Sequence, residues 1–302
     1  MPELPEVETI VRDLDKTVKG LKITDVWVDL KRIIRQPNYD VFVRQVKGKE
    51  ILGARRRAKY ILIDLSDNKT IIIHQKISGH LLYGQWETKN NIPKSLVSGP
   101  LKSDPQNQFI RFILFLNNGR MLGLSDLRRF AKVLLIDTGK VIESKEIKKL
   151  GPEPLGKDFS FERFKQIICK KRAAKGEPRQ RRGKIKPALM DQTVIAGIGN
   201  IYSDEILWYA KIHPLRPIEK LKEQELKKIY QAIKKVLLMA IEAEGDSMQD
   251  YRRLSGELGN YQYQQKAYQM TGKKCPRNDG GIIKRIKIGG RSAHFCPKCQ
   301  KL

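Results

Sequence analysis

The sequence predicts a two-domain α+β protein, in which an N-terminal helix and an antiparallel β-sandwich or barrel precede a helical domain and a small ribbon. Three observations lead to this fold class. Short apolar runs separated by turn residues fill positions 21–135, a pattern typical of sandwiches and barrels. From about residue 156 onward, apolar residues recur at helical spacing. Three of the four cysteines lie in the last 28 residues, which indicates a metal site more than a disulfide.

Length and charge narrow the function. The chain has 302 residues, which suggests roughly two domains. Its 60 Lys and Arg outnumber its 33 Asp and Glu, for a net charge of +27. This excess favours a polyanionic partner, most commonly nucleic acid, because solubility alone needs far less charge. No apolar run approaches 18 residues and no secretion signal opens the chain, so we expect a cytoplasmic protein without a membrane span.

The first ten residues, MPELPEVETI, begin a helix that is predicted to extend to about Val18. Two prolines and several glutamates suit a first helical turn, because the missing proline N–H has no partner there and acids stabilise the positive end of the helix dipole. A second interpretation is chemical. If Met1 is removed, Pro2 becomes a secondary amine with a reference pKa of about 7.7–8.0, and Glu3 lies beside this nucleophile as a proton-transfer partner.

Six apolar stretches in the first half of the chain predict strands. The turn Asn117-Asn118-Gly119-Arg120 joins two of them and is a strong hairpin signal. Residues 87–108 are rich in Asn, Pro, Ser and Lys and predict a long loop. The expected strands are 23–28, 60–65, 71–74, 109–116, 121–124 and 131–136.

Residues 151–155, Gly-Pro-Glu-Pro-Leu, indicate a linker, after which the pattern becomes helical. Residues 163–186 contain 11 Lys or Arg and a single acid. We expect 170–184 to be disordered and to add salt-sensitive affinity for phosphates. Residues 197–200, Gly-Ile-Gly-Asn, separate two helical segments and would turn backbone N–H groups toward an anion. The expected helices are 159–170, 186–195, 199–211 and 218–244.

The C-terminal tail predicts a metal-binding ribbon. Residues 246–266 carry few apolar side chains and predict a mobile loop, and the ribbon hairpin follows over Ile282–Ile288 with two glycines at its tip. Cys296-Pro297-Lys298-Cys299 is a zinc half-site and Cys275 is a third thiol, so tetrahedral zinc needs a fourth ligand from an Asp, Asn or His. Cys169 lies in an apolar helical context and is expected to be a buried thiol.

Several polar residues follow β-runs and resemble a family when they are taken together. Individually, Lys59, His74 and the segment 126–130 are best interpreted as surface charges or core residues. As a set, the motifs resemble the formamidopyrimidine-DNA glycosylases, enzymes of base-excision repair, over the whole chain, and the opening resembles that branch more than the endonuclease VIII branch. The resemblance rests on residues 2–9, Arg57-Ala58-Lys59-Tyr60, His74, Ser78-Gly79, Asp126, Arg128-Arg129-Phe130, residues 151–155, residues 185–192, residues 197–202, Asp204-Glu205, Gly290-Arg291 and residues 294–300.

The resemblance implies a fold and a division of the chain. It implies a catalytic β-sandwich domain over 1–136, a linker over 137–155, and a helix-two-turn-helix domain over 156–266 with a lesion-recognition loop at about 246–266. A zinc ribbon would follow over 267–302.

The resemblance also implies an activity, that of a bifunctional glycosylase and AP lyase for oxidised purines. Pro2 would attack C1′ of the damaged nucleotide, and β- and δ-elimination would follow through a Schiff base. Glu3 would protonate the sugar ring oxygen, and Glu6 would position the nucleophile or a water. Lys59 would contact the phosphate near the lesion.

The partner implied is damaged double-stranded DNA, bound by a monomer associated with the nucleoid. Phosphates would be held by His74, Arg129, Lys186, Asn200 and Arg291. Base extrusion leaves a hole in the duplex, which Arg128 and Phe130 would fill. The third residue at the hole is a methionine in the family and Ile77 here, which is stiffer at χ1.

Two further departures concern the metal and the lesion. The family ribbon has four cysteines, whereas here Asn278 keeps the first spacing and Asp279 keeps the interval to Cys296. We favour Asp279 as the fourth ligand of one structural Zn²⁺, with Cys275, Cys296 and Cys299, because a carboxylate binds zinc better than an amide. A ribbon without zinc is the alternative. The 170–184 stretch is longer than the family's connector, and residues 246–266 match only loosely. Two other functions therefore stay open, a glycosylase preferring oxidised pyrimidines and a non-catalytic binder of damaged DNA.

Overall fold

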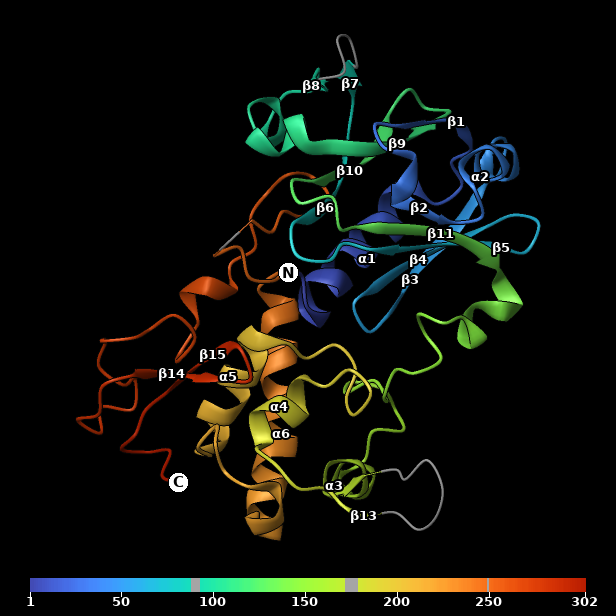
Figure 1. Ribbon diagram of the computed structural model, residues 1–302. Helices are drawn as coiled ribbons and strands as arrows, with labels where there is room; N and C mark the ends of the chain where they lie inside the picture. Colours follow the sequence, from blue (N-terminus) through green and yellow to red (C-terminus); the bar gives the residue numbers. More distant parts are fainter. Residues whose placement is uncertain (88–92, 172–178, 249) are drawn as a thin grey trace. The chain divides into compact units, whose positions relative to one another are not determined.

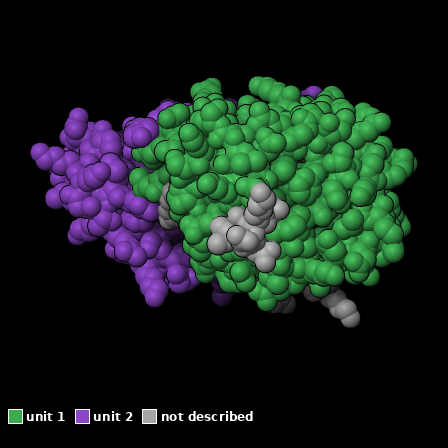
Figure 2. Space-filling model, turned by 90° about the horizontal axis from the view of Figure 1, so that it is seen from above, with its two compact units in different colours: residues 1–148, 241–262 green, residues 149–240, 263–302 purple. Residues whose placement is uncertain are grey.

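The computed structural model describes residues 1–87, 93–171, 179–248 and 250–302 (Figure 1). It divides into two compact units, which Figure 2 distinguishes by colour. Unit 1 comprises residues 1–148 and 241–262, and unit 2 comprises 149–240 and 263–302. Residues 241–262 therefore group with the β-rich unit, although the sequence-based limits place them with the helices. The physical reason is burial, because Tyr251 and Leu254 belong to the core of unit 1.

Unit 1 is a β-sandwich, as predicted, and not a closed barrel. Its four-stranded sheet has the order β1-β9-β10-β6 and its five-stranded sheet the order β2-β11-β5-β4-β3. Neighbours are antiparallel except for the parallel pair β11–β2. The strands are β1 (Ile23–Val28), β2 (Ile34–Gln36), β3 (Ile51–Arg57), β4 (Tyr60–Leu65), β5 (Lys69–His74), β6 (Gly79–Gly84), β9 (Ile110–Leu116), β10 (Met121–Asp126) and β11 (Lys132–Asp137).

All six expected strands are present, but the sequence analysis did not predict β2, β3, β6 or helix α2 (Tyr39–Val46). Strand β3 lies at the edge of its sheet and carries three consecutive arginines, so it has no apolar alternation. Helix α2 is short and begins at Asn38, whose side chain accepts a hydrogen bond from the Val41 N–H at 3.0 Å. The expected loop 87–108 contains β8 (Lys94–Ser95), paired with β7 (Trp86–Glu87), and two 3-10 turns, η3 (Pro100–Lys102) and η4 (Pro105–Phe109); residues 88–92 lie outside the described part.

Helix α1 (Leu4–Val18) joins the sandwich core and has the predicted length. It packs on β3 and β4. Its Val7, Ile10, Val11 and Leu14 are buried together with side chains of both sheets. Each such side chain contributes about 1.5–3 kcal/mol when it is fully buried. The helix start is therefore held rigidly against the sandwich.

The segment 246–262 is irregular in its described residues, 246–248 and 250–262, apart from the 3-10 turn η7 (Tyr261–Tyr263), which begins at its end. It nevertheless packs closely on unit 1. The Leu254 carbonyl accepts a hydrogen bond from Tyr83 of β6 at 2.7 Å. Arg253 forms ion pairs with Asp13 of α1 and with Glu244. Buried side chains and ion pairs thus compensate for the scarcity of regular hydrogen bonds.

Unit 2 contains four helices and a C-terminal hairpin among the residues that the structure describes. The expected helix 186–195 is shorter, since Asp191 ends it and its carboxylate accepts from the Thr193 N–H at 2.9 Å. None of the described helices is both long and apolar enough to cross a bilayer. Of the basic stretch, 172–178 lie outside the described residues. The elements are α3 (Phe161–Cys169), β12 (Lys170–Lys171), β13 (Arg179–Gln180), α4 (Ile185–Met190), α5 (Asn200–Ala210), η6 (Ile218–Lys220), α6 (Glu223–Glu242), β14 (Lys284–Ile288) and β15 (Arg291–Phe295).

Candidate active site and DNA-binding residues

The start of α1 is fixed by two buried glutamates. Glu3 and Glu6 are only 2% and 1% exposed, and they form a reciprocal capping box. One oxygen of Glu6 accepts the Glu3 N–H at 2.7 Å, and the other accepts the Asp246 N–H at 2.9 Å. Glu6 thereby ties the N-terminus to the segment 246–262.

The N-terminal amine lies in a buried, charged environment. Burial lowers the pKa of the Met1 amine, and Lys59 acts in the same direction, whereas Glu3, Glu6 and Asp250 raise it. Lys59 is only 5% exposed. A lowered pKa increases the unprotonated, nucleophilic fraction of an amine near neutral pH. The structure thus brings Glu3, Glu6 and Lys59 together at the chain terminus, although sequence spacing gave no reason for Lys59 to be there.

His74 ends β5 as a neutral side chain. Its Nδ1 accepts the Lys76 N–H at 2.9 Å, and its ring meets Tyr60 edge-on at 4.4 Å between centroids. Burial lowers the pKa of His74 to about 3, with further lowering by Lys76 and Lys59. With Nδ1 acting as the acceptor, the proton lies on Nε2. The side chain can therefore donate a hydrogen bond without carrying a charge.

The buried histidines predict a loss of stability in acid. Burial lowers the pKa values of both His74 and His80 to about 3, whereas unfolded histidine titrates near 6.5. The unfolded chain thus binds protons between these values and the folded chain does not, so stability is lost as the pH falls below 6.5. Each histidine should remove about 2 kcal/mol between pH 7 and pH 5. Urea unfolding at pH 7 and at pH 5 should show this loss in the free energy of unfolding. The variant His80→Leu should lose only about half as much between the two pH values. An unaltered pH dependence in His80→Leu would contradict the lowered pKa of His80.

The loop after β10 presents the residues predicted to fill the duplex. Asp126 is fully buried, and its carboxylate accepts from the Ser78 hydroxyl at 2.6 Å and the Ala131 N–H at 2.7 Å. The loops 75–78 and 127–130 are therefore joined. Their tips expose Ile77 by 43% and Phe130 by 50%.

These tips carry cations beside the apolar groups. The Arg128 guanidinium lies 5.2 Å from the centre of the Phe130 ring. Arg129 takes a left-handed backbone conformation, with φ 57°, and its guanidinium nitrogen lies 3.7 Å from a carboxylate oxygen of Asp29. Leu127, which sequence reasoning did not select, is 52% exposed in the same loop. Exposed apolar tips on a rigid base suit insertion between bases.

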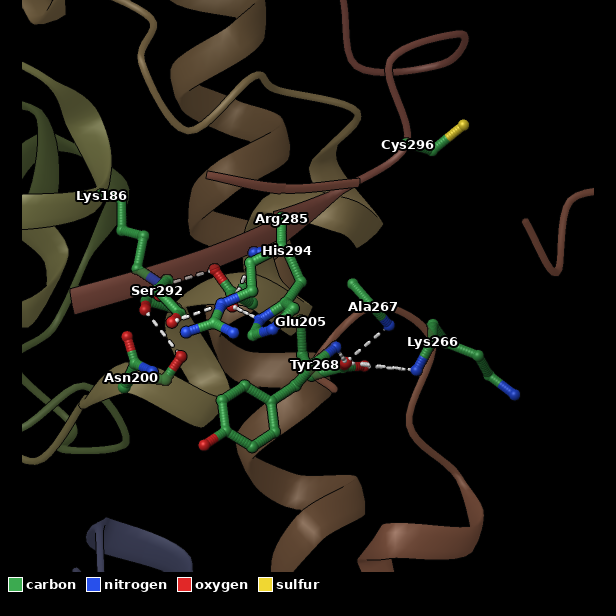
Figure 3. Close-up of polar contacts among 12 residues, drawn as sticks. Lys186, Asn200, Glu205, Lys266, Ala267, Tyr268, Arg285, Ser292, His294 and Cys296 are labelled. Carbon is green, nitrogen blue, oxygen red and sulfur yellow. Dashed lines mark hydrogen bonds and ion pairs between the residues drawn. The ribbon is translucent and has the colours of Figure 1, made fainter. Parts of the chain in front are cut away.

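In unit 2, Lys186 is buried, and Figure 3 draws its polar contacts. Its Nζ donates to Asp204 at 2.5 Å and to the Ser292 carbonyl at 2.8 Å. Asp204 also accepts the backbone N–H of His294 at 3.0 Å. Lys186 thus joins α4, α5 and β15, and its contact with a phosphate stays a prediction. Asn200 begins α5 with an Oδ1 atom that has no partner among the described residues, and Arg291 is exposed at the start of β15.

Glu205 is a buried anchor to which sequence reasoning assigned no role. It is 0% exposed, and its carboxylate accepts the backbone N–H groups of Lys266, Ala267 and Tyr268 at 2.8–3.1 Å (Figure 3). Burial raises the pKa of Glu205 to about 7, against the effect of these three donors. The available signal was an acidic pair, Asp204-Glu205, inside an otherwise apolar helix.

Removing this anchor should destabilise unit 2. Glu205→Ala leaves three buried N–H groups without an acceptor, at about 1 kcal/mol or more each, so we expect a loss of about 3 kcal/mol or more. Glu205→Gln keeps one acceptor oxygen and should lose less. Urea unfolding followed by Trp208 fluorescence, with Trp27 and Trp86 replaced by Phe, measures the effect. Glu242→Ala, at the exposed end of α6, is the control and should change the free energy of unfolding very little. An equally small change in Glu205→Ala would refute the anchoring role of Glu205.

The C-terminal ribbon gathers four possible metal ligands. One ligand atom from each of Cys275, Asp279, Cys296 and Cys299 lies within 4.8 Å of the others. Three sulfurs and a carboxylate suit tetrahedral zinc, so this cluster can bind one zinc ion. The Asp279 carboxylate accepts the Gly281 N–H at 2.7 Å, which orients it toward Cys296. A side chain at Gly281 would meet the Cys296 sulfur at 2.4 Å, so glycine is required here.

The fourth cysteine, Cys169, differs from expectation, and an arginine beside the metal-ligand cluster was not foreseen. Cys169 is half-buried and not buried, because it is the last residue of α3. Arg277 was not selected from the sequence, yet its guanidinium stacks on Trp208 at 3.6 Å and donates to the Cys299 sulfur at 3.2 Å. It connects the ligand cluster to the end of α5.

Comparisons with known proteins cover the whole chain. Residues 1–133 match the formamidopyrimidine-DNA glycosylase N-terminal domain, 150–252 the H2TH domain of the same enzymes, and 272–302 the zinc finger found in FPG and IleRS. A formamidopyrimidine-DNA glycosylase of Pelotomaculum thermopropionicum is 39% identical over 302 residues, which is 100% of both chains.

Solved structures agree with this match. A Lactococcus lactis FPG variant in complex with DNA containing Fapy-dG has 32% identity and a TM-score of 0.84 over 100% of both chains. The wild-type Lactococcus lactis Fpg (MutM) in complex with DNA containing an oxidised pyrimidine has 32% identity and a TM-score of 0.83, again over 100% of both chains. The two-domain fold with a C-terminal zinc finger is thus shared along the whole length.

Proposed function

The chain belongs to the formamidopyrimidine-DNA glycosylase family, and on that premise we propose that it is a bifunctional DNA glycosylase and AP lyase that removes oxidised purines. Substrates would include 8-oxoguanine and formamidopyrimidines in double-stranded DNA. The observation that carries the proposal is the placement of Pro2, which is buried at the start of α1, where the buried Glu3, Glu6 and Lys59 gather around the chain terminus. A non-catalytic binder would not need two buried glutamates and a buried lysine around its N-terminus.

The nucleophile is the nitrogen of Pro2 after removal of Met1. Its lone pair attacks C1′ of the damaged nucleotide, and the base leaves with the electrons of the glycosidic bond and takes up a proton. Opening of the sugar gives an iminium ion, which accepts electrons when a C2′ proton is lost and the 3′ phosphate departs. A second elimination releases the 5′ phosphate, and hydrolysis of the imine restores the amine. The product is a one-nucleotide gap.

Three neighbours of the amine divide the remaining work. Glu3 is suited to give a proton to the sugar ring oxygen, since it precedes the first turn of α1. Glu6 is suited to positioning, because its two oxygens accept the N–H groups of Glu3 and Asp246. Lys59 is suited to hold the phosphate beside the lesion as a buried cation.

The remaining candidate residues would grip and deform the duplex. Ile77, Arg128 and Phe130 would occupy the space of the extruded base, which repays the cost of unstacking. His74, Arg129, Lys186, Asn200 and Arg291 would contact phosphates. With a net charge of +27, binding should weaken steeply with salt. We further propose that the protein acts as a monomer near the nucleoid, with zinc stabilising the ribbon.

A covalent trap tests the chemistry. The protein is incubated with duplex DNA containing an abasic site, and borohydride is added to reduce the Schiff base. We expect a stable protein–DNA adduct whose attachment maps to Pro2 by peptide mass spectrometry. Absence of the adduct, or attachment at a lysine, would overturn the proposed nucleophile.

Oxidised pyrimidines are the second candidate substrate class, because one structural relative is a complex with DNA containing such a base. Cleavage of 8-oxoguanine opposite cytosine is compared with cleavage of thymine glycol under single-turnover conditions. We expect faster excision of the purine. Faster excision of thymine glycol would reverse the substrate assignment and leave the lyase chemistry intact.

A further inference from the structure

Two buried side chains of unit 1 have no hydrogen-bond partner for any of their polar atoms. Gln75 is 2% exposed and His80 is 1% exposed. Both amide atoms of Gln75 and both ring nitrogens of His80 lack partners within the described residues. A buried polar atom without a partner costs about 1–3 kcal/mol, and such groups are rare in folded proteins. Four of them on two residues only five positions apart indicate a ligand that supplies the missing partners.

Gln75 and His80 lie on either side of the tight connection between β5 and β6, and the charge of the N-terminal amine acts on the His80 ring. The Gln75 carbonyl accepts the Gly79 N–H at 3.0 Å, which closes the turn between β5 and β6. A Cβ at Gly79 would lie 2.2 Å from that carbonyl, so the turn has to be this tight. Burial lowers the pKa of His74, and Lys76 and Lys59 lower it further. Burial lowers the pKa of His80, and Arg252 and the N-terminal amine lower it further.

The missing partner is a neutral polar group. Burial lowers the pKa of His80 to about 3, so its ring offers one donor and one acceptor without charge at neutral pH. The Gln75 amide offers two donors and an acceptor, also without charge. A phosphate would be paired with cations, such as Lys59 nearby. The edge of a nucleobase, which carries neutral donors and acceptors, fits this pair better.

We propose that Gln75 and His80 form a hydrogen-bonding site for the damaged base once it has left the duplex. The proposal rests on the proposed function, since it adds base recognition beside the same amine. The four atoms are sealed from solvent in this structure. A base therefore reaches them only when the side chains packed over Gln75 and His80 move aside.

The test separates base recognition from sugar chemistry. Gln75→Leu and His80→Leu are assayed under single-turnover conditions on duplexes containing 8-oxoguanine and on duplexes containing an abasic site. We expect each variant to excise 8-oxoguanine about 10- to 100-fold more slowly, because one set of base contacts is lost. Cleavage at the abasic site should stay within about 2-fold, since no base is present. His80→Gln, which keeps a donor and an acceptor, should recover part of the excision.

The controls keep the test decisive. Ser95→Ala removes another buried hydroxyl without a partner, in the small β7–β8 sheet, and should leave both rates unchanged. Urea unfolding should show Gln75→Leu and His80→Leu at pH 7.5 to be as stable as the wild type or more stable, because an uncompensated polar group has gone. Unchanged excision in both variants, or equal loss on both substrates, would overturn the proposal. Failure of the wild type to cleave abasic DNA would instead overturn the proposed function.

Discussion

Blocking the N-terminal nitrogen is expected to abolish base excision and abasic cleavage together. Inserting a glycine between Met1 and Pro2 turns the Pro2 nitrogen into an amide, whose lone pair is delocalised and cannot attack C1′. We expect both rates to fall by about 10³-fold or more, as is typical when a nucleophile is lost.

The measurement is single-turnover cleavage of 8-oxoguanine and abasic duplexes, with intact mass confirming the N-terminus of each preparation. A glycine added after the exposed Leu302 is the matched control and should be fully active. The blocked protein should still bind abasic DNA with nearly wild-type affinity, because Arg128, Phe130 and the phosphate-binding residues are unchanged. Cleavage by the blocked protein at a tenth of the wild-type rate would show that another group is the nucleophile.

Sequence reasoning succeeded where the structural cause is local. The opening helix was predictable because Val7, Ile10 and Leu14 share one face and a capping box precedes them. The β9–β10 hairpin was predictable because Gly119, with φ 78°, supplies the conformation that its turn requires. Strand β3 was not predictable in the same way, since its place at a sheet edge permits a run of arginines that hides the strand period.

The site was predictable only in part, for the same physical reason. The residues of the N-terminal motif lie within a few positions of one another, and so do Cys296 and Cys299, so both patterns can be read from the sequence. The Glu6–Asp246 contact joins residues separated by 240 positions, and Glu205 meets its three partners more than 60 positions away. Gln75 and His80 lie in a short turn, but their lack of partners is a property of packing that spacing does not reveal.

The zinc ligand at Asp279 carries the second large expected effect. Asp279→Ala should reduce zinc retention by about 100-fold or more, because it opens one corner of the tetrahedron and a water replaces a charged ligand. Asp279→Cys keeps the charge and supplies a softer ligand, so it should retain zinc at least as well as the wild type. The rate at which each of the three proteins releases zinc to a chromophoric chelator ranks their zinc retention.

Asn278→Ala distinguishes the two candidate ligands. Asn278 takes a left-handed conformation, with φ 53°, whereas an oxygen of Asp279 lies 3.5 Å from the Cys296 sulfur, the separation expected of two ligands on one small cation. Asn278→Ala should therefore keep its zinc, apart from the strain of placing alanine at positive φ. Because Cys296 follows β15 directly, zinc loss in Asp279→Ala should also loosen the end of the β14–β15 hairpin and weaken DNA binding through Arg291. Full zinc content in Asp279→Ala with loss in Asn278→Ala would transfer the ligand role to the amide.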